Sequence, residues 1–181
     1  MPSYVALLRA INLGGVRSLP MEKVRTAFAR VGATSVTTYI ASGNAVFMHD
    51  QRSAITLIAK LASALEEEAG FAVPVVLRTR AEWTAAIEAN PYKKSDTVHC
   101  AFLPAALSAA ELAKVDQIDR NAHLPSEFAI YARQVYFDLP GGSGNDTLAN
   151  TVLRIFPDAT VRNWRTVTKL GTMLAELAPP R

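Results

Sequence analysis

The chain contains a single cysteine, Cys100, among its 181 residues, which excludes a disulfide within the chain. No apolar run approaches the roughly 18 residues that a membrane span needs. The residues that follow Met1 lack the basic, apolar and small-residue progression of a secretory signal. We therefore expect a cytoplasmic protein that does not contact a membrane.

Clusters of residues that would carry chemistry are also missing. His49 and His123 have no partner at metal-ligand spacing. His99 and Cys100 are adjacent on a predicted strand, so their side chains point to opposite faces and cannot pair with each other. There is no nucleotide fingerprint and no set of acid, base and nucleophile. The sequence predicts no metal and no cofactor, and it favours a non-catalytic role over an enzyme.

The charge is low but unevenly distributed. The 19 basic and 16 acidic side chains leave a net charge of +3, too mild by itself to indicate a nucleic-acid or membrane protein. Basic residues exceed acidic ones in 1–34 and again in 159–181, so the middle of the chain is acidic. With 50% hydrophobic residues, the chain is long enough to bury a core.

Apolar periodicity predicts a βαββαβ order in the first half of the chain. Gly32 and Gly70 are placed to end its helices, Ser42-Gly43-Asn44 is a hairpin turn, and Pro74 suggests an edge strand. The predicted elements are a strand over 4–9, a helix over 20–31, strands over 35–41 and 45–48, a helix over 55–69 and a strand over 73–78.

The same order recurs in the second half, after a short helix over 83–89. Ser108 and Glu111 form a capping box, and Asp146 is placed to cap a later helix. The predicted elements are a strand over 97–103, a helix around 112–118, a hairpin over 128–131 and 134–139, a helix through 148–155, a strand near 160 and a final helix.

The predicted fold class is therefore α+β, with two ferredoxin-like βαββαβ plaits, each an antiparallel sheet with helices on one face. The predicted domains are an N-terminal plait over 1–79, a helical linker over 80–95 and a C-terminal plait over 96–181. The expected strand order in such a sheet is 4-1-3-2. This order brings the end of the first strand and the turn between the second and third strands to the same end of the sheet.

That end of the sheet supplies a candidate ligand site in the first half, because glycine amides and polar side chains gather there. Glycines after a strand are also needed simply for the turn, so a purely structural role is the alternative. The candidate residues are Arg9, Asn12, Gly14, Gly15, Ser42, Gly43 and Asn44.

The start of the last helix supplies a second candidate site. Asn163 is a good N-cap, and Arg165 and Lys169 lie four residues apart in the first turns, where cations oppose the helix dipole and repel each other. A bound anion would reverse both penalties. The candidate residues are Arg162, Asn163, Trp164, Arg165, Thr166, Thr168 and Lys169.

A simpler interpretation of that stretch is also open. Trp164 packs in the core in this interpretation, and the cations are solvated or pair with Asp138, Asp158 or Glu176. The glycine loop over 141–144 is similar in composition to a phosphate loop, but it lacks the Lys-Ser/Thr pair that such a loop needs.

Three segments resemble the bacterial family called domain of unknown function 1697. They are residues 4–15 (YVALLRAINLGG), 38–47 (TYIASGNAVF) and 162–170 (RNWRTVTKL). The resemblance runs along essentially the whole chain and implies two ferredoxin-like plaits, but it implies no activity. It also marks a departure at Gly144-Asn145-Asp146, where many relatives carry a basic residue and Ser-Lys.

The sequence favours a non-catalytic module that binds a small anionic ligand bearing a phosphate or a carboxylate. One alternative is a protein that binds RNA or single-stranded nucleic acid, because RNA-recognition modules share the βαββαβ order. That alternative needs stacking aromatics, and the central strands of the first half offer only Tyr4 and Phe47. A structural or protein-interaction module is the other alternative. The oligomeric state is not predicted.

Overall fold

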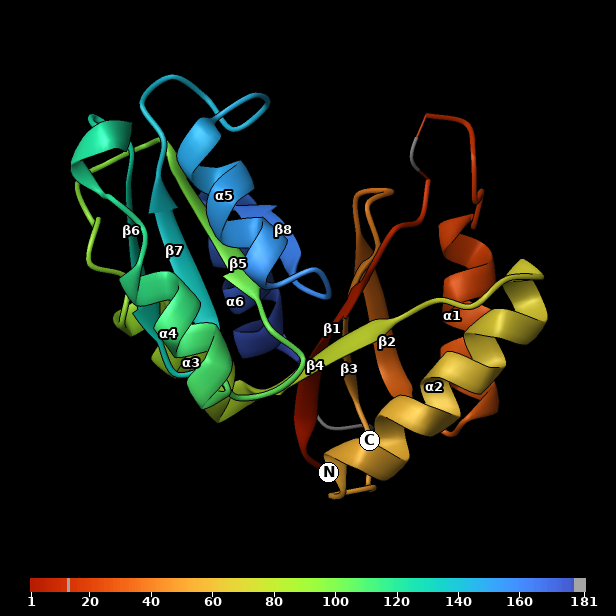
Figure 1. Ribbon diagram of the computed structural model, residues 1–181. Coiled ribbons are helices and arrows are strands. Elements are labelled where there is room, and N and C mark those ends of the chain that lie inside the picture. The colour runs from red at the N-terminus through yellow and green to blue at the C-terminus, as the bar shows by residue number, and fades with distance from the viewer. Residues whose placement is uncertain (13, 178–181) are drawn as a thin grey trace. The chain divides into compact units, whose positions relative to one another are not determined.

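The computed structural model describes residues 1–12 and 14–177 and contains two four-stranded antiparallel sheets, with orders β2-β3-β1-β4 and β6-β7-β5-β8 (Figure 1). The chain divides into two compact units. Unit 1 comprises Met1–Ala85 together with Lys169–Arg181, and unit 2 comprises Ala86–Thr168. Helices α3 (Arg80–Glu88) and α6 (Trp164–Glu176) each belong partly to both units.

Unit 1 is organised around its central strand. Its elements are β1 (Ser3–Leu8), α1 (Met21–Arg30), β2 (Thr34–Tyr39), β3 (Asn44–Met48), α2 (Ala54–Ala69) and β4 (Val75–Thr79). Strand β1 pairs antiparallel with β3 on one side and with β4 on the other. Every residue of β1 is buried, so both of its faces lie inside the protein.

Helices α1 and α2 lie side by side against one face of this sheet (Figure 1). Tyr4 and Phe47 project into the core from β1 and β3, and their rings stack with centroids 5.6 Å apart. Phe28 from α1 meets the Phe47 ring edge-on at 5.0 Å. Aromatic pairs in these geometries stabilise a core beyond the area they bury.

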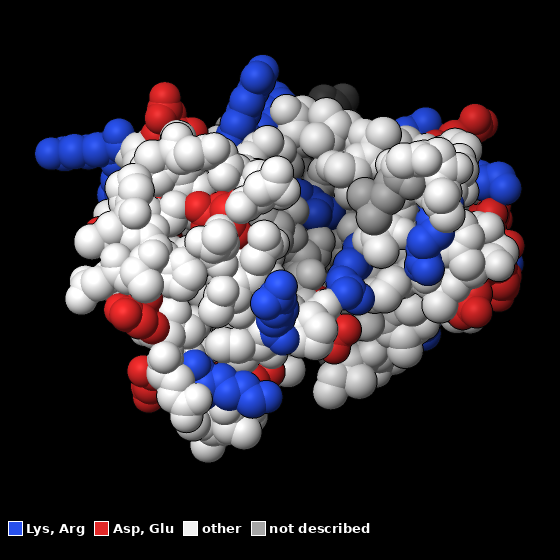
Figure 2. Space-filling view, turned by 45° about the horizontal axis from the view of Figure 1, so that its top comes forward, with Lys and Arg blue, Asp and Glu red and all other residues white. Residues whose placement is uncertain are grey.

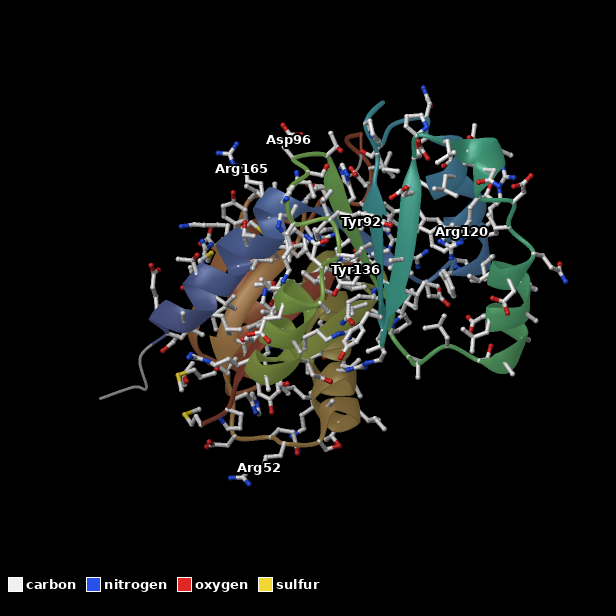
Figure 3. The ribbon with its side chains drawn as sticks, turned by 90° about the vertical axis from the view of Figure 1, so that its left-hand side faces the viewer. Arg52, Tyr92, Asp96, Arg120, Tyr136 and Arg165 are labelled. Atoms are coloured by element: carbon white, nitrogen blue, oxygen red, sulfur yellow. The ribbon has the colours of Figure 1, made fainter. Side chains whose placement is uncertain are left out.

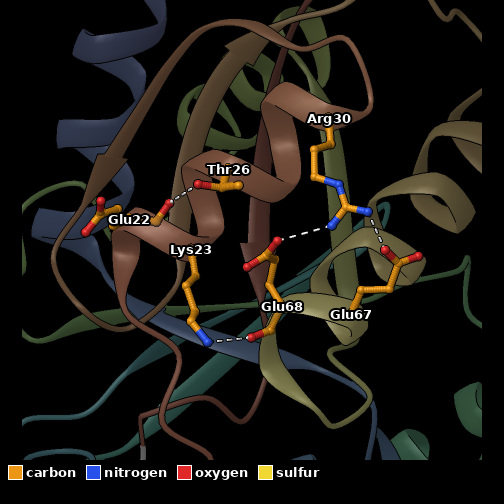
Figure 4. A network of polar contacts seen from close by, with 6 residues as sticks. All are labelled: Glu22, Lys23, Thr26, Arg30, Glu67 and Glu68. Carbon is orange, nitrogen blue, oxygen red and sulfur yellow. Dashed lines mark hydrogen bonds and ion pairs between the residues drawn. The ribbon is translucent and has the colours of Figure 1, made fainter.

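A polar network joins α1 to the end of α2 on the surface (Figure 4). The Arg30 guanidinium donates to the carboxylates of Glu67, at 2.5 Å, and Glu68, at 3.1 Å. The Lys23 ammonium donates to the backbone carbonyl of Glu68 at 3.0 Å. The two carboxylates raise the pKa of Arg30, with Glu67 contributing most. Such exposed pairs are worth little individually, but they attach the two helices to each other at this end.

Unit 2 has its own central strand, β5, between β7 and β8. Its elements are β5 (Val98–Phe102), α4 (Ala109–Asp116), the short 3₁₀ helix η1 (Asn121–His123), β6 (Glu127–Tyr131), β7 (Gln134–Asp138), α5 (Thr147–Ile155) and β8 (Thr160–Asn163). A hydrophobic core forms between the sheet and helices α4 and α5. Phe137 of β7 and Val152 of α5 lie at its centre and are almost completely buried.

The structure confirms an α+β fold with two antiparallel sheets, and the strand order is the expected 4-1-3-2 read from the other edge. Strand β4, which follows Pro74, is an edge strand as predicted. The predicted caps are present: Ser108 and Glu111 form a capping box, and Asp146 accepts from the Ala149 amide at 2.8 Å. Helix η1 has no counterpart among the predicted elements. Within the described residues, no helix is long and apolar enough to cross a bilayer.

Gly43 sits in the β2–β3 turn with φ +82° and lies against the end of β1. A Cβ at this position would lie 2.7 Å from the Leu8 Cβ and 2.9 Å from the Ile11 Cδ1. The Gly43 carbonyl also accepts from the Leu8 amide at 2.7 Å. Both the backbone conformation and the close approach therefore require glycine here.

We predict that Gly43→Ala lowers the free energy of unfolding by about 2–4 kcal/mol, because it adds left-handed strain and a steric overlap with buried side chains. The matched control is Gly70→Ala, since Gly70 has φ +76° but nothing within 4 Å of where a Cβ would lie. The control is expected to lose only about 1 kcal/mol. Urea unfolding followed by circular dichroism measures both values. Equal losses in the two variants would contradict the packing argument.

Candidate functional site

The predicted N-terminal site lies in unit 1, where Asn12 joins two loops. Its side-chain Nδ2 donates to the Leu19 carbonyl at 3.0 Å and to the Ala41 carbonyl at 2.7 Å. Its Oδ1 accepts from the Leu19 amide at 2.7 Å. The structure thus brings the loop after β1 and the β2–β3 turn together, as the strand order predicts. Both N–H groups of the Asn12 carboxamide are therefore engaged in holding the two loops together.

Asn44 has a similar internal role in the turn. It is only 1% exposed, and its Nδ2 donates to the Tyr39 carbonyl and to the Ser42 Oγ, each at 3.0 Å. These bonds fix the conformation of the turn that carries Gly43. The amide of Asn44 consequently faces protein atoms.

The remaining predicted residues of this set differ in their surroundings. Gly14 and Gly15 have φ +55° and +81°, and nothing lies within 4 Å of where a side chain would project. Their backbone is therefore open on that side. The backbone amide of Arg9 donates to the Pro74 carbonyl at 3.0 Å, which ties the end of β1 to the start of β4.

Arg17 is a residue of this loop that the sequence did not single out. Its Nε donates to the Ala10 carbonyl at 2.7 Å, and its Nη2 donates to the Ala72 carbonyl. The guanidinium lies over the Phe71 ring, 4.6 Å from the centroid. A basic residue within a glycine-containing loop was the available clue, but the Ala72 partner lies 55 residues further along the chain.

The predicted C-terminal site begins where β8 leads directly into α6. Asn163 is the helix cap, as expected, because its Oδ1 accepts from the Thr166 amide at 2.8 Å. The Trp164 ring meets the Tyr136 ring of β7 edge-on, with centroids 6.3 Å apart. Trp164 is only partly buried, so it anchors the start of the helix without being a full core residue.

Arg162 is buried in the sheet, with 9% of its surface exposed. Its Nη1 donates to the Thr160 Oγ1 and to the Val161 carbonyl, each at 2.8 Å. Burial lowers the pKa of Arg162 to about 10, so the guanidinium stays protonated at neutral pH. Both of these acceptors belong to β8 itself, and Arg162 lies opposite the buried Cys100 of β5.

Arg165 and Lys169 are the exposed cations of this segment. Figure 3 shows the Arg165 side chain at the outside of the protein. Within residues 1–12 and 14–177, neither side chain forms an ion pair, so of the two options in the simpler interpretation these cations fit solvation and not pairing with acidic neighbours. Thr168 points its hydroxyl back into the helix, donating to the Trp164 and Arg165 carbonyls at 3.1 Å each.

A pocket of about 650 Å³ lies in unit 2, lined mostly by residues of the predicted helical linker over 80–95. Asn90 is one of its lining residues and is 1% exposed. The Asn90 Oδ1 accepts from the Tyr92 amide at 2.9 Å, whereas its Nδ2 is buried and has no hydrogen-bond partner among the described residues. The lining residues are Glu88, Asn90, Pro91, Tyr92, Lys93, Lys94, Ser95 and Asp138.

Two further features define this pocket. Asp138 accepts hydrogen bonds from the Ser95 and Thr97 hydroxyls, each at 2.6 Å, which fixes its carboxylate. Burial raises the pKa of Tyr92 to about 12, with the nearby Glu127 adding to the effect. The phenol therefore remains a neutral hydrogen-bond donor well above physiological pH.

The sheet register places Asp138 of this pocket and the start of α6 at the same end of the strands of unit 2. Val98 of β5 pairs with Asp138 of β7, and the next residue, His99, pairs with Asn163 of β8. Because β7 and β8 flank β5, Asp138 and Asn163 are separated by two strand spacings, roughly 10 Å. One lining residue of the pocket, Asp138, and the helix cap, Asn163, thus lie two strands apart at the same end of the sheet.

The chain matches a family model, and its architecture is similar to that of a bacterial protein of known structure. A family model described as "Protein of unknown function (DUF1697)" matches residues 1–136, and the chain belongs to this family. The match confirms the family that the sequence resembles, over a range that contains the segments 4–15 and 38–47 but not 162–170. A solved structure, the conserved bacterial protein SP0830 from Streptococcus pneumoniae, is similar with a TM-score of 0.80 and 22% identity, covering 97% of this chain and 99% of that chain. At this identity the likeness shows the fold alone. No curated protein matches the chain.

We predict that Asn12→Ala lowers the free energy of unfolding by about 2 kcal/mol, since it removes three hydrogen bonds and leaves the Leu19 backbone unsatisfied in a partly buried place. Chemical denaturation measures the change. The exposed Asn150 of α5 provides the control, and Asn150→Ala is expected to change stability by less than about 0.5 kcal/mol. A loss no larger than that of the control would show that the two loops do not depend on Asn12.

Proposed function

We propose that the protein is a non-catalytic module that binds a small anionic ligand, phosphate- or carboxylate-bearing, at the start of α6. The observation that carries this proposal is the pair of exposed cations, Arg165 and Lys169, on the first turns of a capped helix with no carboxylate paired to either among the described residues. Both cations oppose the helix dipole and repel each other at their i,i+4 spacing. An anion bound beside them turns both unfavourable terms into favourable ones.

The surrounding residues support the same assignment by giving the helix start a fixed position. Asn163 caps the helix, β8 pairs with β5 up to Asn163, and the Trp164 ring rests on Tyr136. A binding group that is already held in place loses less conformational freedom when a ligand arrives. The exposed side chains of Arg165 and Lys169 are then the direct contacts.

In the N-terminal set, we assign different roles to different residues. The side-chain donors of Asn12 and Asn44 are engaged with protein carbonyls and a hydroxyl, so we assign both residues to loop positioning. Arg9, Gly14 and Gly15 stay candidates for ligand contact in unit 1, because the glycine backbone is open. We also propose that each unit is a ferredoxin-like plait, an assignment supported by the strand order.

Nucleic-acid binding has weaker support. On the central strands of unit 1, Tyr4 and Phe47 are buried against the helices, which leaves them unavailable for base stacking. On the face seen in Figure 2, Lys and Arg side chains lie in separate groups with acidic residues near several of them.

We predict that inorganic phosphate raises the melting temperature of the protein, and that the double variant Arg165→Ala with Lys169→Ala removes this increase. The physical reason is that binding to the folded state alone stabilises it, by an amount that grows with the ratio of ligand concentration to dissociation constant. Thermal shift across a phosphate titration at constant ionic strength measures the effect.

The matched control carries Lys114→Ala with Arg154→Ala, which removes two exposed cations from α4 and α5 of unit 2. This control is expected to keep the full phosphate response. The proposal fails if phosphate does not stabilise the unmodified protein, or if the two double variants lose the response equally.

A further inference from the structure

A smaller cavity of unit 2 lies at the start of β6 and has a volume of about 280 Å³. Sites for drug-sized ligands are usually larger, roughly 300–1,000 Å³, so this cavity suits a small metabolite. It brings together a cation, a carboxylate, a phenol and apolar side chains. The lining residues that matter here are Tyr92, Arg120, Leu124, Glu127, Phe128 and Leu148.

Arg120 presents a guanidinium that is already held in place. Its Nη1 donates to the Phe128 carbonyl at 2.7 Å, and the guanidinium lies over the Phe128 ring, 4.0 Å from the centroid. Among the described residues, its Nε and Nη2 have no hydrogen-bond partner and the side chain forms no ion pair. These two nitrogens form the edge that binds a carboxylate through two parallel hydrogen bonds. The position of Arg120 therefore suits a carboxylate that the chain itself does not supply.

Glu127 adds a carboxylate to the same cavity as the first residue of β6. It pairs with Asp138 of β7, so two acidic residues lie directly opposite each other, which is unfavourable. Asp138 is stabilised by the Ser95 and Thr97 hydroxyls, each at 2.6 Å. The Glu127 side chain has no hydrogen bond or ion pair with any described residue. An ammonium group bound beside Glu127 would offset the repulsion.

The cavity thus contains both charges without a direct pair between them in the described part of the chain. Arg120 bonds the carbonyl of the residue that follows Glu127, and Tyr92 and Arg120 both lie beside β6 (Figure 3). Burial raises the pKa of Tyr92 to about 12, while Glu127 adds to this rise and Arg120 opposes it. Both charges therefore act on one phenol, which stays a neutral hydrogen-bond donor. A zwitterion placed here would pair with both.

Leu124 gives the cavity an accessible apolar wall. It is 60% exposed, which is high for a large hydrophobic residue, whereas Phe128 and Leu148 are almost completely buried behind the cavity. Covering the Leu124 side chain with an apolar group removes hydrocarbon surface from water, which is favourable. The ligand is thus expected to carry an apolar group besides its two charges.

We propose that this cavity binds a free α-amino acid with an apolar side chain. Arg120 receives its carboxylate, Glu127 receives its ammonium group, and Leu124 contacts its side chain. This site shares no residue with the start of α6, so it goes beyond the function proposed above and does not depend on it.

The test uses isothermal titration calorimetry with L-leucine, L-methionine and L-phenylalanine. Each amino acid is compared with one analogue that lacks the ammonium group and one that lacks the carboxylate; for leucine these are 4-methylpentanoate and 3-methylbutylamine. We expect at least one amino acid to bind about tenfold or more tightly than either of its analogues, because each analogue loses a hydrogen bond between charged groups.

Two variants locate the site. Glu127→Gln is expected to weaken binding of that amino acid about tenfold and to leave the analogue without an ammonium group unaffected. Arg120→Lys keeps a cation but loses the two-nitrogen edge, so it is expected to weaken the amino acid about tenfold and to leave the amine analogue unaffected. The matched controls are Asp116→Asn on α4 and Arg154→Lys on α5, both exposed and outside the cavity, and neither is expected to change any affinity.

Circular dichroism melting checks that each variant is folded. Glu127→Gln removes no contact with a described residue, so it decides the question even if Arg120→Lys unfolds. The inference is overturned if no amino acid binds more tightly than both of its analogues, or if Glu127→Gln weakens binding no more than Asp116→Asn does. The double variant Arg165→Ala with Lys169→Ala is expected to keep the amino-acid affinity, and an equal loss there would also overturn the assignment. Absence of a phosphate response leaves this site standing, because phosphate tests the start of α6 alone.

Discussion

Burial of the central strand in each sheet is the constraint on which the rest of the structure depends. In unit 1, β1 is buried on both faces and paired on both sides, so it cannot shift or tilt without breaking two sets of backbone hydrogen bonds. Its ends are therefore fixed points. The loop after β1 is tied to the neighbouring turn by Asn12 and by the close approach of Gly43. In unit 2, β5 fixes the positions of Asp138 and Asn163 in the same way, because it pairs with β7 on one side and with β8 on the other.

The sequence predicted well those features whose partners are close along the chain. The caps at Ser108, Asp146 and Asn163 were correct because each involves a backbone amide three residues away. The strands and helices followed from apolar periodicity. The strand order followed from the βαββαβ order of the elements along the chain, once a ferredoxin-like antiparallel sheet was assumed. The candidate site at the start of α6 stays a prediction, and it is also a local inference, since it needs only the cap and the spacing of Arg165 and Lys169.

Features that depend on distant partners could not be predicted. The sequence suggests that the acidic run containing Glu67 is a solvated helix end. In the structure, the Glu67 carboxylate accepts a hydrogen bond from the Arg30 guanidinium, 37 residues earlier in the chain. Gly43 reads as an ordinary turn residue, because nothing in the sequence shows that Leu8 and Ile11 pack against it. An Asn before Pro, as at Asn90, suggests a turn in which Oδ1 accepts a hydrogen bond. Only the folded chain shows that the other half of this amide is buried beside a pocket.

The division of the chain between the two units also affects the order in which the units can fold during synthesis. Unit 2 is continuous, whereas unit 1 contains both Met1–Ala85 and Lys169–Arg181. In unit 1, Arg80 of α3 donates to the Ser3 hydroxyl at 2.9 Å and to the Leu174 carbonyl in the second half of α6. During synthesis on a ribosome the N-terminal part emerges first, but its last segment appears only after all of unit 2 has been translated. The first unit to start folding is consequently the last to be completed.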